Sequence, residues 1–223
     1  MKKVLVFAIH PDDETLGCGG TLLKHKEQRD EIHWLIGTHI HEADGFSEER
    51  IAERNKEIKK VSEMYSFTSV HNLEIPTMRV DECSMSELIS KVSDIFKKIE
   101  PNIIYLPFKS DAHSDHRIFF EAAYSCTKVF RYPFVETIYM METLSETDFS
   151  LSTKEDYFVP NTFVDISQYM DKKIDIMKVF ESEIGDHPFP RSERNMKALA
   201  TFRGATANCE YAESFMLLKT IIK

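Results

Sequence analysis

Apolar segments with strand character alternate with helical segments through the first half of the chain, and this order restricts the fold more than any other feature. The runs VLVFAI, IHWLIGT and NIIYLPF are nearly unbroken and rich in β-branched and aromatic residues, which is typical of strands covered on both faces. The run VHNLEI predicts a further short strand. Strands and helices in alternation form right-handed crossovers and a parallel sheet. We therefore predict an α/β fold, a Rossmann-like three-layer αβα sandwich with a mainly parallel central sheet.

Apolar residues spaced three and four apart predict helices between these strands. The expected helices cover residues 21–27, 47–65 and 85–99, and the last follows a capping box, Ser84-x-x-Glu87. The second half is less regular, with strands expected within 136–143 and 158–166 and helices at 168–183 and 194–202. The 223 residues contain no linker or internal repeat, so we predict a single domain over residues 1–223.

Composition and charge exclude several classes of protein. A net charge of −9 disfavours binding to nucleic acid or to an anionic membrane surface, since both require basic patches. No apolar run reaches the roughly 18 to 20 residues that span a bilayer. The four cysteines are widely spread without a Cys-x-x-Cys pair, which indicates neither a disulfide framework nor a thiolate zinc site. We expect a cytoplasmic protein without nucleic-acid partners or membrane insertion, and leave open whether it forms a homo-oligomer.

Two clusters of histidines and carboxylates follow two of the predicted strands. The first strand ends in His10-Pro11-Asp12-Asp13-Glu14, and the fourth leads into FKSDAHSDHR at residues 108–117. In a doubly wound sheet of order 3-2-1-4 the first and fourth strands are neighbours, and ligands bind at their carboxyl ends. We therefore predict that the two clusters meet in one crevice, although about a hundred residues separate them.

A metal site explains this concentration of acids and imidazoles. A catalytic zinc typically takes three protein ligands and leaves one position for water. Two imidazoles and one carboxylate would come from a set of four residues: His10, Asp13, His113 and His116. Helix capping alone would also explain acids at a helix N-terminus. The second cluster favours the metal site, because a cation would relieve the repulsion between adjacent carboxylates in a partly buried turn.

Other polar residues near these motifs allow two interpretations. His39 and His41 would share one face if their strand continues through both, and would then border the site, but the pattern favours ordinary loop residues. The loop at residues 185–192 contains His187, followed by Pro188 and Pro190, which restrict the backbone, and could form a rim over the pocket. The glycines of GCGGT do not match the dinucleotide spacing, so we interpret them as sites of close helix packing.

At the two clusters the sequence resembles the PIG-L, or LmbE-like, family of zinc-dependent deacetylases, which remove acyl groups from N-acylated amino sugars. The family's Ala-His-Pro-Asp-Asp-Glu motif stands as IHPDDE, with Ile9 replacing alanine, and its His-x-Asp-His motif stands at residues 113–116. The resemblance extends over residues 1–223 through weaker matches in three later segments: RNKEIKKVSEMYSF, VDISQYMDKKIDIMKVFESE and RGATANCEYAESF. THIHEADGF and the missing glycine after Arg203-Gly204 depart from the family pattern, which leaves the substrate uncertain.

The resemblance implies a role for each residue of the motifs. It implies that the zinc ligands are His10, Asp13 and His116 and that Asp12 is the general base. His113, as an imidazolium, would stabilise the oxyanion or protonate the leaving amine, and Asp115 would orient a neighbouring histidine. The same resemblance implies supporting roles around the metal for Glu14 and Asp111.

Arg54 has two interpretations. The resemblance implies that it reaches sugar hydroxyls of the substrate. Arg54 and Glu57 also lie on one helix face, three residues apart, so an ion pair between them would explain both side chains without a substrate.

These expectations together predict a metal-dependent hydrolase. It would cleave the linear amide C–N bond of an N-acetylated amino sugar, such as an N-acetylglucosamine conjugate, with metal-bound water as nucleophile and zinc, or alternatively ferrous iron, as cofactor. Two alternatives stay open. A non-haem iron oxygenase uses the same set of two histidines and one carboxylate. The second alternative is a sugar-binding protein that contains the metal but does not catalyse a reaction, and the presence of both Asp12 and His113 argues against it.

Overall fold

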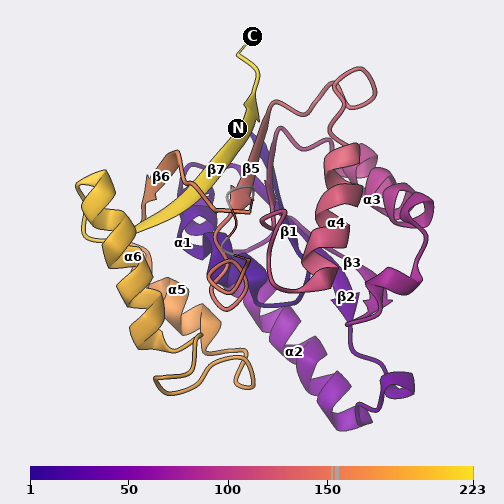
Figure 1. The fold of residues 1–223 in the computed structure, drawn as a ribbon, viewed down its shortest axis with the longest axis horizontal. Helices are drawn as coiled ribbons and strands as arrows, with labels where there is room; N and C mark the ends of the chain where they lie inside the picture. The colour runs from indigo at the N-terminus through magenta and orange to yellow at the C-terminus, as the bar shows by residue number, and fades with distance from the viewer. Residues whose placement is uncertain (152, 154–155, 223) are drawn as a thin grey trace.

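The computed structural model describes residues 1–151, 153 and 156–222, and within them seven strands form one central sheet (Figure 1). The strand order is β3-β2-β1-β4-β5-β7-β6, in which β1 to β5 pair in parallel and β7 is antiparallel to both β5 and β6. The strands are β1 (Lys3–Ala8), β2 (Glu31–His39), β3 (Ser69–Pro76), β4 (Ile103–Leu106), β5 (Thr137–Met141), β6 (Thr162–Asp165) and β7 (Ala212–Thr220). The predicted mainly parallel sheet with β1 between β2 and β4 is confirmed.

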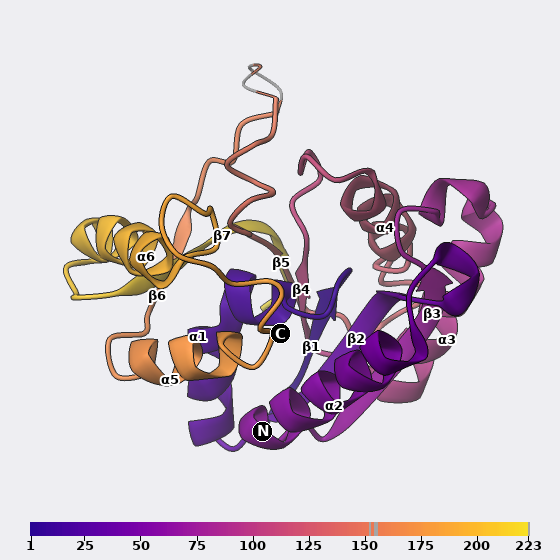
Figure 2. The same ribbon diagram turned by 90° about the horizontal axis from the view of Figure 1, so that it is seen from below.

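Helices cover both faces of this sheet, which confirms the three-layer arrangement (Figure 2). One layer contains α1 (Asp13–Glu27), α2 (Glu48–Tyr65), α5 (Met170–Met177) and α6 (Glu193–Ala207), and the other contains α3 (Met85–Ile99) and α4 (Ser114–Ser125). Short 3-10 turns, η1 (Glu42–Asp44) and η2 (Val80–Glu82), follow β2 and β3. None of the helices in the described part of the chain is long and apolar enough to cross a membrane.

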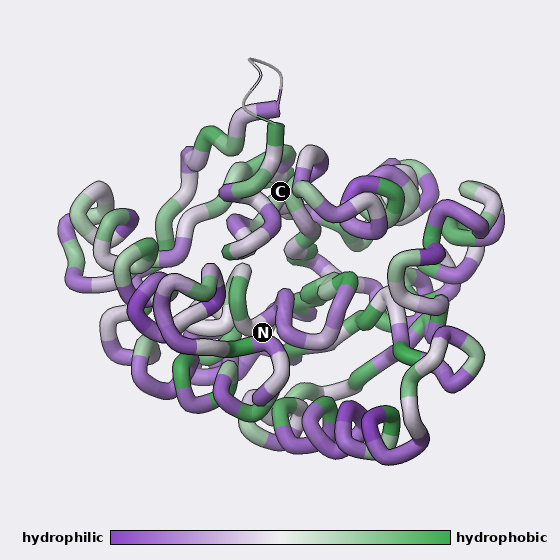
Figure 3. The backbone as a smooth tube through the Cα atoms, turned by 60° about the horizontal axis from the view of Figure 1, so that its bottom comes forward, coloured by the Kyte–Doolittle hydropathy of each residue, from purple (hydrophilic) through white to green (hydrophobic). Residues whose placement is uncertain are grey.

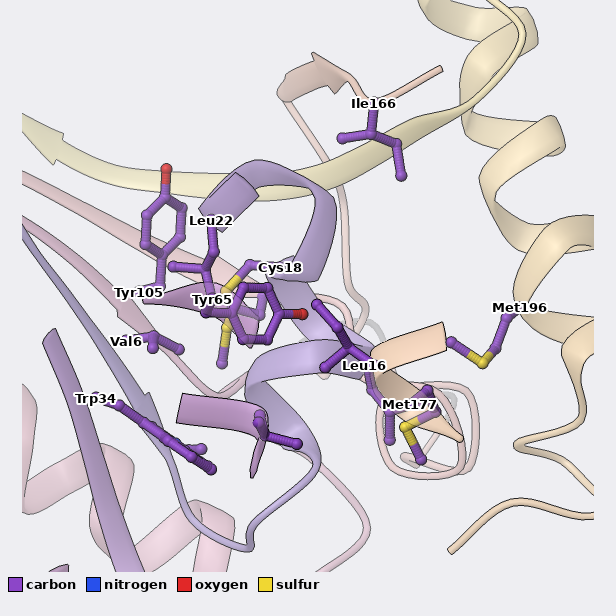
Figure 4. Close-up of a cluster of buried hydrophobic side chains, with 14 of the residues drawn as sticks. Val6, Leu16, Cys18, Leu22, Trp34, Tyr65, Tyr105, Ile166, Met177 and Met196 are labelled. Atoms are coloured by element: carbon purple, nitrogen blue, oxygen red, sulfur yellow. The ribbon is translucent and has the colours of Figure 1, made fainter. Parts of the chain in front are cut away.

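Side chains of β1 alternate between the two layers. Val4 and Val6 pack with the cluster that includes α1 and α2, whereas Leu5 and Phe7 pack with the cluster that includes α3 and α4. All four are fully buried. Figure 4 shows Val6 close to residues of α1 in the first cluster, and Figure 3 shows hydrophobic and hydrophilic residues alternating along the outer helices. The nearly unbroken apolar run of β1 thus follows from its burial on both faces.

The helices expected at residues 47–65 and 85–99 are present as α2 and α3. Ser47 and Ser84 are their N-caps, and each hydroxyl accepts a backbone N–H at 3.2 Å, from Arg50 and Glu87 respectively. These bonds satisfy donors that the first turn of a helix otherwise leaves free.

The prediction for the first helix was wrong at its start, because α1 begins at Asp13 and not at residue 21. Glycine has poor helix propensity, so GCGGT carried no helical signal. Packing explains the glycines instead: a Cβ on Gly20 would lie 2.7 Å from the Ile166 side chain, and a Cβ on Gly17 would lie 2.9 Å from Met141 Cβ. These distances support the interpretation of GCGGT as a segment of close helix packing. The helix is also kinked at Cys18, within the same segment.

Other elements also differ from the sequence prediction. Neither α4 nor β7 was predicted, α5 ends at Met177 rather than at residue 183, and α6 continues to Ala207 rather than ending at 202. At the end of α6, Asn208 adopts a left-handed conformation with φ of 56°, which terminates the helix. β7 is held by antiparallel pairing with two strands that are distant from it in sequence, and local patterns carry little information about such pairing.

A buried ion pair connects α1, α5 and β7. Lys173 Nζ lies 2.7 Å from Glu213 Oε1 and also donates to the Leu16 carbonyl at 2.9 Å. The Glu213 carboxylate accepts the backbone N–H groups of Gly20 and Thr21 at 2.9 and 2.7 Å. Both charged side chains are almost completely buried, so each depends on the other to compensate its charge.

We expect Lys173→Ala to lower the free energy of unfolding by about 3 to 5 kcal/mol, because it leaves the Glu213 carboxylate buried without its cation. Lys178→Ala is the matched control, since Lys178 pairs with Glu193 at the surface and its loss should cost less than about 1 kcal/mol. Urea unfolding followed by circular dichroism measures both. Equal effects of the two substitutions would contradict a structural role for the buried pair.

Candidate active site

The two histidine–carboxylate clusters meet at the carboxyl ends of β1 and β4, as predicted. His10 follows β1, and Asp13 begins α1. His113 is the N-cap of α4, and His116 lies in its first turn. Because β1 and β4 pair in parallel, the segments that follow them leave the sheet at the same edge.

Three side chains of these clusters have the geometry of a metal site. His116 Nε2 lies 3.2 Å from Asp13 Oδ2 and 3.3 Å from His10 Nδ1, and His10 Nδ1 lies 3.9 Å from Asp13 Oδ2. Tetrahedral ligands with bonds of about 2.0 to 2.1 Å are separated by roughly 3.3 Å. The predicted set of His10, Asp13 and His116 could therefore hold a divalent metal with little movement.

Each of the two imidazoles faces a further carboxylate through its other nitrogen. His116 Nδ1 lies 2.9 Å from Asp111 Oδ2, and His10 Nε2 lies 3.4 Å from Asp115 Oδ2. Burial raises the pKa of Asp111. Burial opposes ionisation of Asp115 as well, but hydrogen bonds from His10 and from the Met78 N–H outweigh it and lower the pKa of that carboxyl. Carboxylates in these positions fix the tautomer and orientation of ligand imidazoles.

The three acids after β1 have different surroundings. Asp13 is buried, but the His116 and His10 imidazoles outweigh the burial and lower its pKa. Burial and the neighbouring Asp13 raise the pKa of Asp12 well above its ordinary value, although Arg191 Nη1, 3.6 Å away, opposes this. Asp12 also has an unusual φ of 149°, a strained conformation at the junction of strand and helix.

Glu14 is outside the candidate ligand cluster. Its Oε2 accepts the backbone N–H of Asp12 at 3.1 Å, its Oε1 accepts the Thr15 hydroxyl at 2.6 Å, and burial raises its pKa to about 8. Glu14 therefore supports the backbone of the strained Asp12.

His113 is held in one orientation by the helix that it caps. Its Nδ1 accepts the backbone N–H of Asp115 at 3.1 Å, so in the neutral ring the proton is on Nε2. Burial and the neighbouring His10 lower the pKa of His113 to about 4. These interactions favour a neutral ring with an Nε2–H donor over the imidazolium that the family resemblance implies.

A cavity of about 530 Å³ opens beside these residues, a volume typical of small-molecule sites. His10, Asp12 and His113 lie in its wall, whereas Asp13 and His116 are buried behind it. The rest of the wall comes from β2, α2 and the loops after β1, β2, β3, β5 and α5. Its residues are Pro11, Thr38, His39, Ile40, Phe46, Arg50, Arg54, Thr77, Met78, Glu146, Ser182, Glu183 and Arg191.

Arg54 forms the expected ion pair and also lines the cavity. Its Nε lies 3.3 Å from Glu57 Oε2, so the ion pair exists, and its Nη1 donates to the Pro11 carbonyl at 3.0 Å. It also bonds Glu183, and its guanidinium lies 5.5 Å from the centre of the Phe180 ring. Arg54 lines the cavity, but these contacts already occupy most of its donors.

Several residues of the cavity wall were not identified from the sequence. The predicted rim loop at residues 185–192 does line the cavity, but through Arg191 and not through His187, and Glu183 lies just before this loop. His39 is buried and lines the cavity, contrary to its interpretation as an ordinary loop residue. His41 does not line it and instead contacts the Glu74 carbonyl at 3.1 Å. The sequence signal for this position of His39 was the possible continuation of the predicted strand through it, and β2 does extend to His39.

Comparison with known proteins gives similarities in both sequence and fold. The family model described as PIG-L, GlcNAc-PI de-N-acetylase, matches residues 5–127. A diacetylchitobiose deacetylase of Thermococcus kodakarensis is 25% identical over 238 residues, which cover 99% of this chain and 85% of that protein.

Among solved structures, the conserved protein TT1542 of Thermus thermophilus superposes with a TM-score of 0.79 at 23% identity, covering 100% of this chain and 97% of the other. GalB of Pseudomonas putida KT2440, a 4-carboxy-2-hydroxymuconate hydratase, superposes with a TM-score of 0.77 at 17% identity. The superposition covers 100% of this chain and 98% of GalB. These two likenesses show the fold alone, and the fold is shared by proteins of different activities.

We expect zinc to raise the melting temperature of protein that has been stripped of metal, because an ion that binds only the folded state stabilises it. His116→Ala should abolish most of this rise, since His116 contributes Nε2 to the three-ligand cluster. Differential scanning fluorimetry with a zinc titration measures the shift. His187→Ala, which changes a histidine outside the cavity, should keep it. A full zinc-induced rise in His116→Ala would exclude the proposed ligand set.

Proposed function

Because the chain belongs to the PIG-L family, we propose that it is a zinc-dependent hydrolase that removes an acetyl or other acyl group from the amide nitrogen of an N-acylated amino sugar. The observation that carries the proposal is the convergence of His10, Asp13 and His116 beside a buried carboxylate, Asp12, at the wall of one cavity. The deacetylase activity in the name of the Thermococcus relative supports it. Ferrous iron is the alternative metal for this set of ligands.

His10, Asp13 and His116 would hold the metal at the edge of the cavity. When bound there, it would supply electrophilic chemistry, polarising the acyl oxygen of the substrate and lowering the pKa of a water molecule toward about 7. Asp111 and Asp115 would keep the two imidazoles oriented, each through the ring nitrogen that faces away from the metal position.

Asp12 is our candidate for the general base. Its carboxylate lies in the cavity wall next to the ligand Asp13, and Arg191 limits its orientation at 3.6 Å. Asp12 takes a proton from the water whose oxygen attacks the acyl carbon. The same proton then passes to the leaving nitrogen as the C–N bond breaks, which yields a free amine and a carboxylic acid that releases its remaining proton to solvent. Burial favours the protonated state that this second transfer requires.

His113 is our candidate for stabilising the oxyanion. With Nδ1 occupied by the Asp115 N–H, the neutral ring presents Nε2–H as a donor toward the cavity. A fixed donor in a partly buried site stabilises negative charge on the acyl oxygen without reorganisation. In this proposal His113 acts as a neutral hydrogen-bond donor and not as the imidazolium that the family resemblance implies. Asp12 alone then carries out the proton transfers.

The charges of the cavity wall favour an uncharged sugar. Arg54 and Arg191 both contact Glu183, and Arg50 contacts Glu57, so these guanidinium groups are compensated by carboxylates of the protein. A neutral sugar binds through the hydrogen bonds of its hydroxyl groups, so its recognition does not require an uncompensated positive charge in the cavity wall. We propose that Arg54 borders the sugar.

The alternative functions have less support. An iron oxygenase would use the same ligands, but the family match favours amide hydrolysis. A non-catalytic binding protein would have no need of Asp12 and His113 in the cavity wall. A cytoplasmic location, the single domain and any homo-oligomer stay predictions from the sequence.

We expect Asp12→Asn to lower kcat by about 10² to 10⁴-fold, because the amide cannot accept the proton of the attacking water. Bound metal should stay unchanged, since Asp12 is outside the ligand cluster. Acetate release from a panel of N-acetylated sugars, including N,N′-diacetylchitobiose, measures activity, and elemental analysis measures metal. Glu121→Gln, at an exposed position of α4, is the control. Wild-type turnover in Asp12→Asn would rule out Asp12 as the base.

Substitutions of His113 distinguish a neutral donor from a cation. We expect His113→Ala to lower kcat by about 10² to 10³-fold, and His113→Gln, which keeps an N–H donor, to lower it less. The pH profile of the Gln variant should keep its shape, because no titration of His113 would be needed. Loss of the alkaline limb of that profile in His113→Gln would instead support the imidazolium.

A further inference from the structure

We propose that Glu146 is a positioning residue of this site, acting through His113. The inference rests on the proposed deacetylase function, because it concerns the same cavity. Glu146 lies in the loop after β5, is partly buried and lines the cavity beside His113. It belongs to neither of the sequence motifs.

Two hydrogen bonds connect Glu146 to the segment before α4. Its Oε2 accepts the backbone N–H of His113 at 3.0 Å, and its backbone carbonyl accepts the N–H of Ala112 at 3.1 Å. Glu146 is itself held in a turn, since its own N–H donates to the Thr143 carbonyl at 3.2 Å. The side chain and backbone of one residue thus fix two successive peptide groups next to the proposed oxyanion donor.

The helix cannot provide this acceptor by itself. In a capping box the third residue of the helix returns a glutamate or glutamine side chain to the N–H of the N-cap. The N-cap of α4 is His113, and the third residue is His116, whose ring faces Asp13 and Asp111. Since His116 belongs to the candidate metal site, Glu146 supplies from another loop the bond that would otherwise come from the helix.

The residue after Glu146 supports the other histidine of α4. Thr147 donates its hydroxyl to Asp111 Oδ1 at 2.7 Å, and Asp111 Oδ2 lies 2.9 Å from His116 Nδ1. One turn after β5 therefore positions both histidines, His113 through Glu146 and His116 through Thr147 and Asp111. Loss of each support should produce a different defect.

Four variants test this division. We expect Glu146→Ala to lower kcat by about 10- to 100-fold with KM and bound metal unchanged, because a small misplacement of a donor has effects of this size. Glu146→Gln keeps a carbonyl acceptor for the His113 N–H and should restore most of the activity. Thr147→Val should instead weaken zinc affinity by about tenfold and keep kcat at saturating zinc. Glu121→Ala, on the exposed side of α4, should match the wild type.

Hydrogen exchange gives a readout that does not depend on turnover. The amide of His113 should exchange faster in Glu146→Ala and keep its protection in Glu146→Gln and Glu121→Ala. Wild-type kcat and protection in Glu146→Ala would overturn the proposal, and so would equal losses in the Ala and Gln variants, which would assign the effect to charge. If the wild type releases no acetate from any sugar, the proposed function fails, while amide exchange still decides whether Glu146 holds His113.

Discussion

The contact between the Asp13 carboxylate and the His116 imidazole, 3.2 Å apart, joins the two halves of the site. It brings together segments that follow β1 and β4, and it lowers the pKa of Asp13 against the effect of its burial. The acids around it would repel one another without positive charge, which a divalent metal would supply. The parallel pairing of β1 with β4 is what makes this contact geometrically available.

The surrounding structure keeps these charged groups in place through successive hydrogen bonds. Glu14 supports the strained backbone of Asp12, and Asp111 connects His116 to Thr147 in the turn after β5. Each bond satisfies a buried polar group that would otherwise be costly. The candidate site is consequently built on elements from most of the chain, although the residues proposed to react lie in two short motifs.

The fold by itself does not determine the reaction, since a hydratase and a protein of this family share it. The candidate metal ligands lie behind the cavity wall and at its edge, whereas the wall itself comes largely from loops and helix ends. His39 and Arg191 belong to this wall. Selectivity for a particular sugar would depend on such residues, because they border the parts of a substrate that the metal site does not reach.

The sequence by itself determined the alternating α/β order, the position of β1 beside β4 and the meeting of the two histidine–carboxylate clusters, because these follow from local periodicity and from a general rule for parallel sheets. Only the tertiary structure decided the early start of α1, the pairing of β7 and the cavity roles of His39, Arg191 and Glu146. The glycines of α1 lack helix propensity and are helical because they pack against Met141 and Ile166. Glu146 has no periodic pattern around it, and the role proposed for it depends on a hydrogen bond to His113 that no local sequence signal encodes.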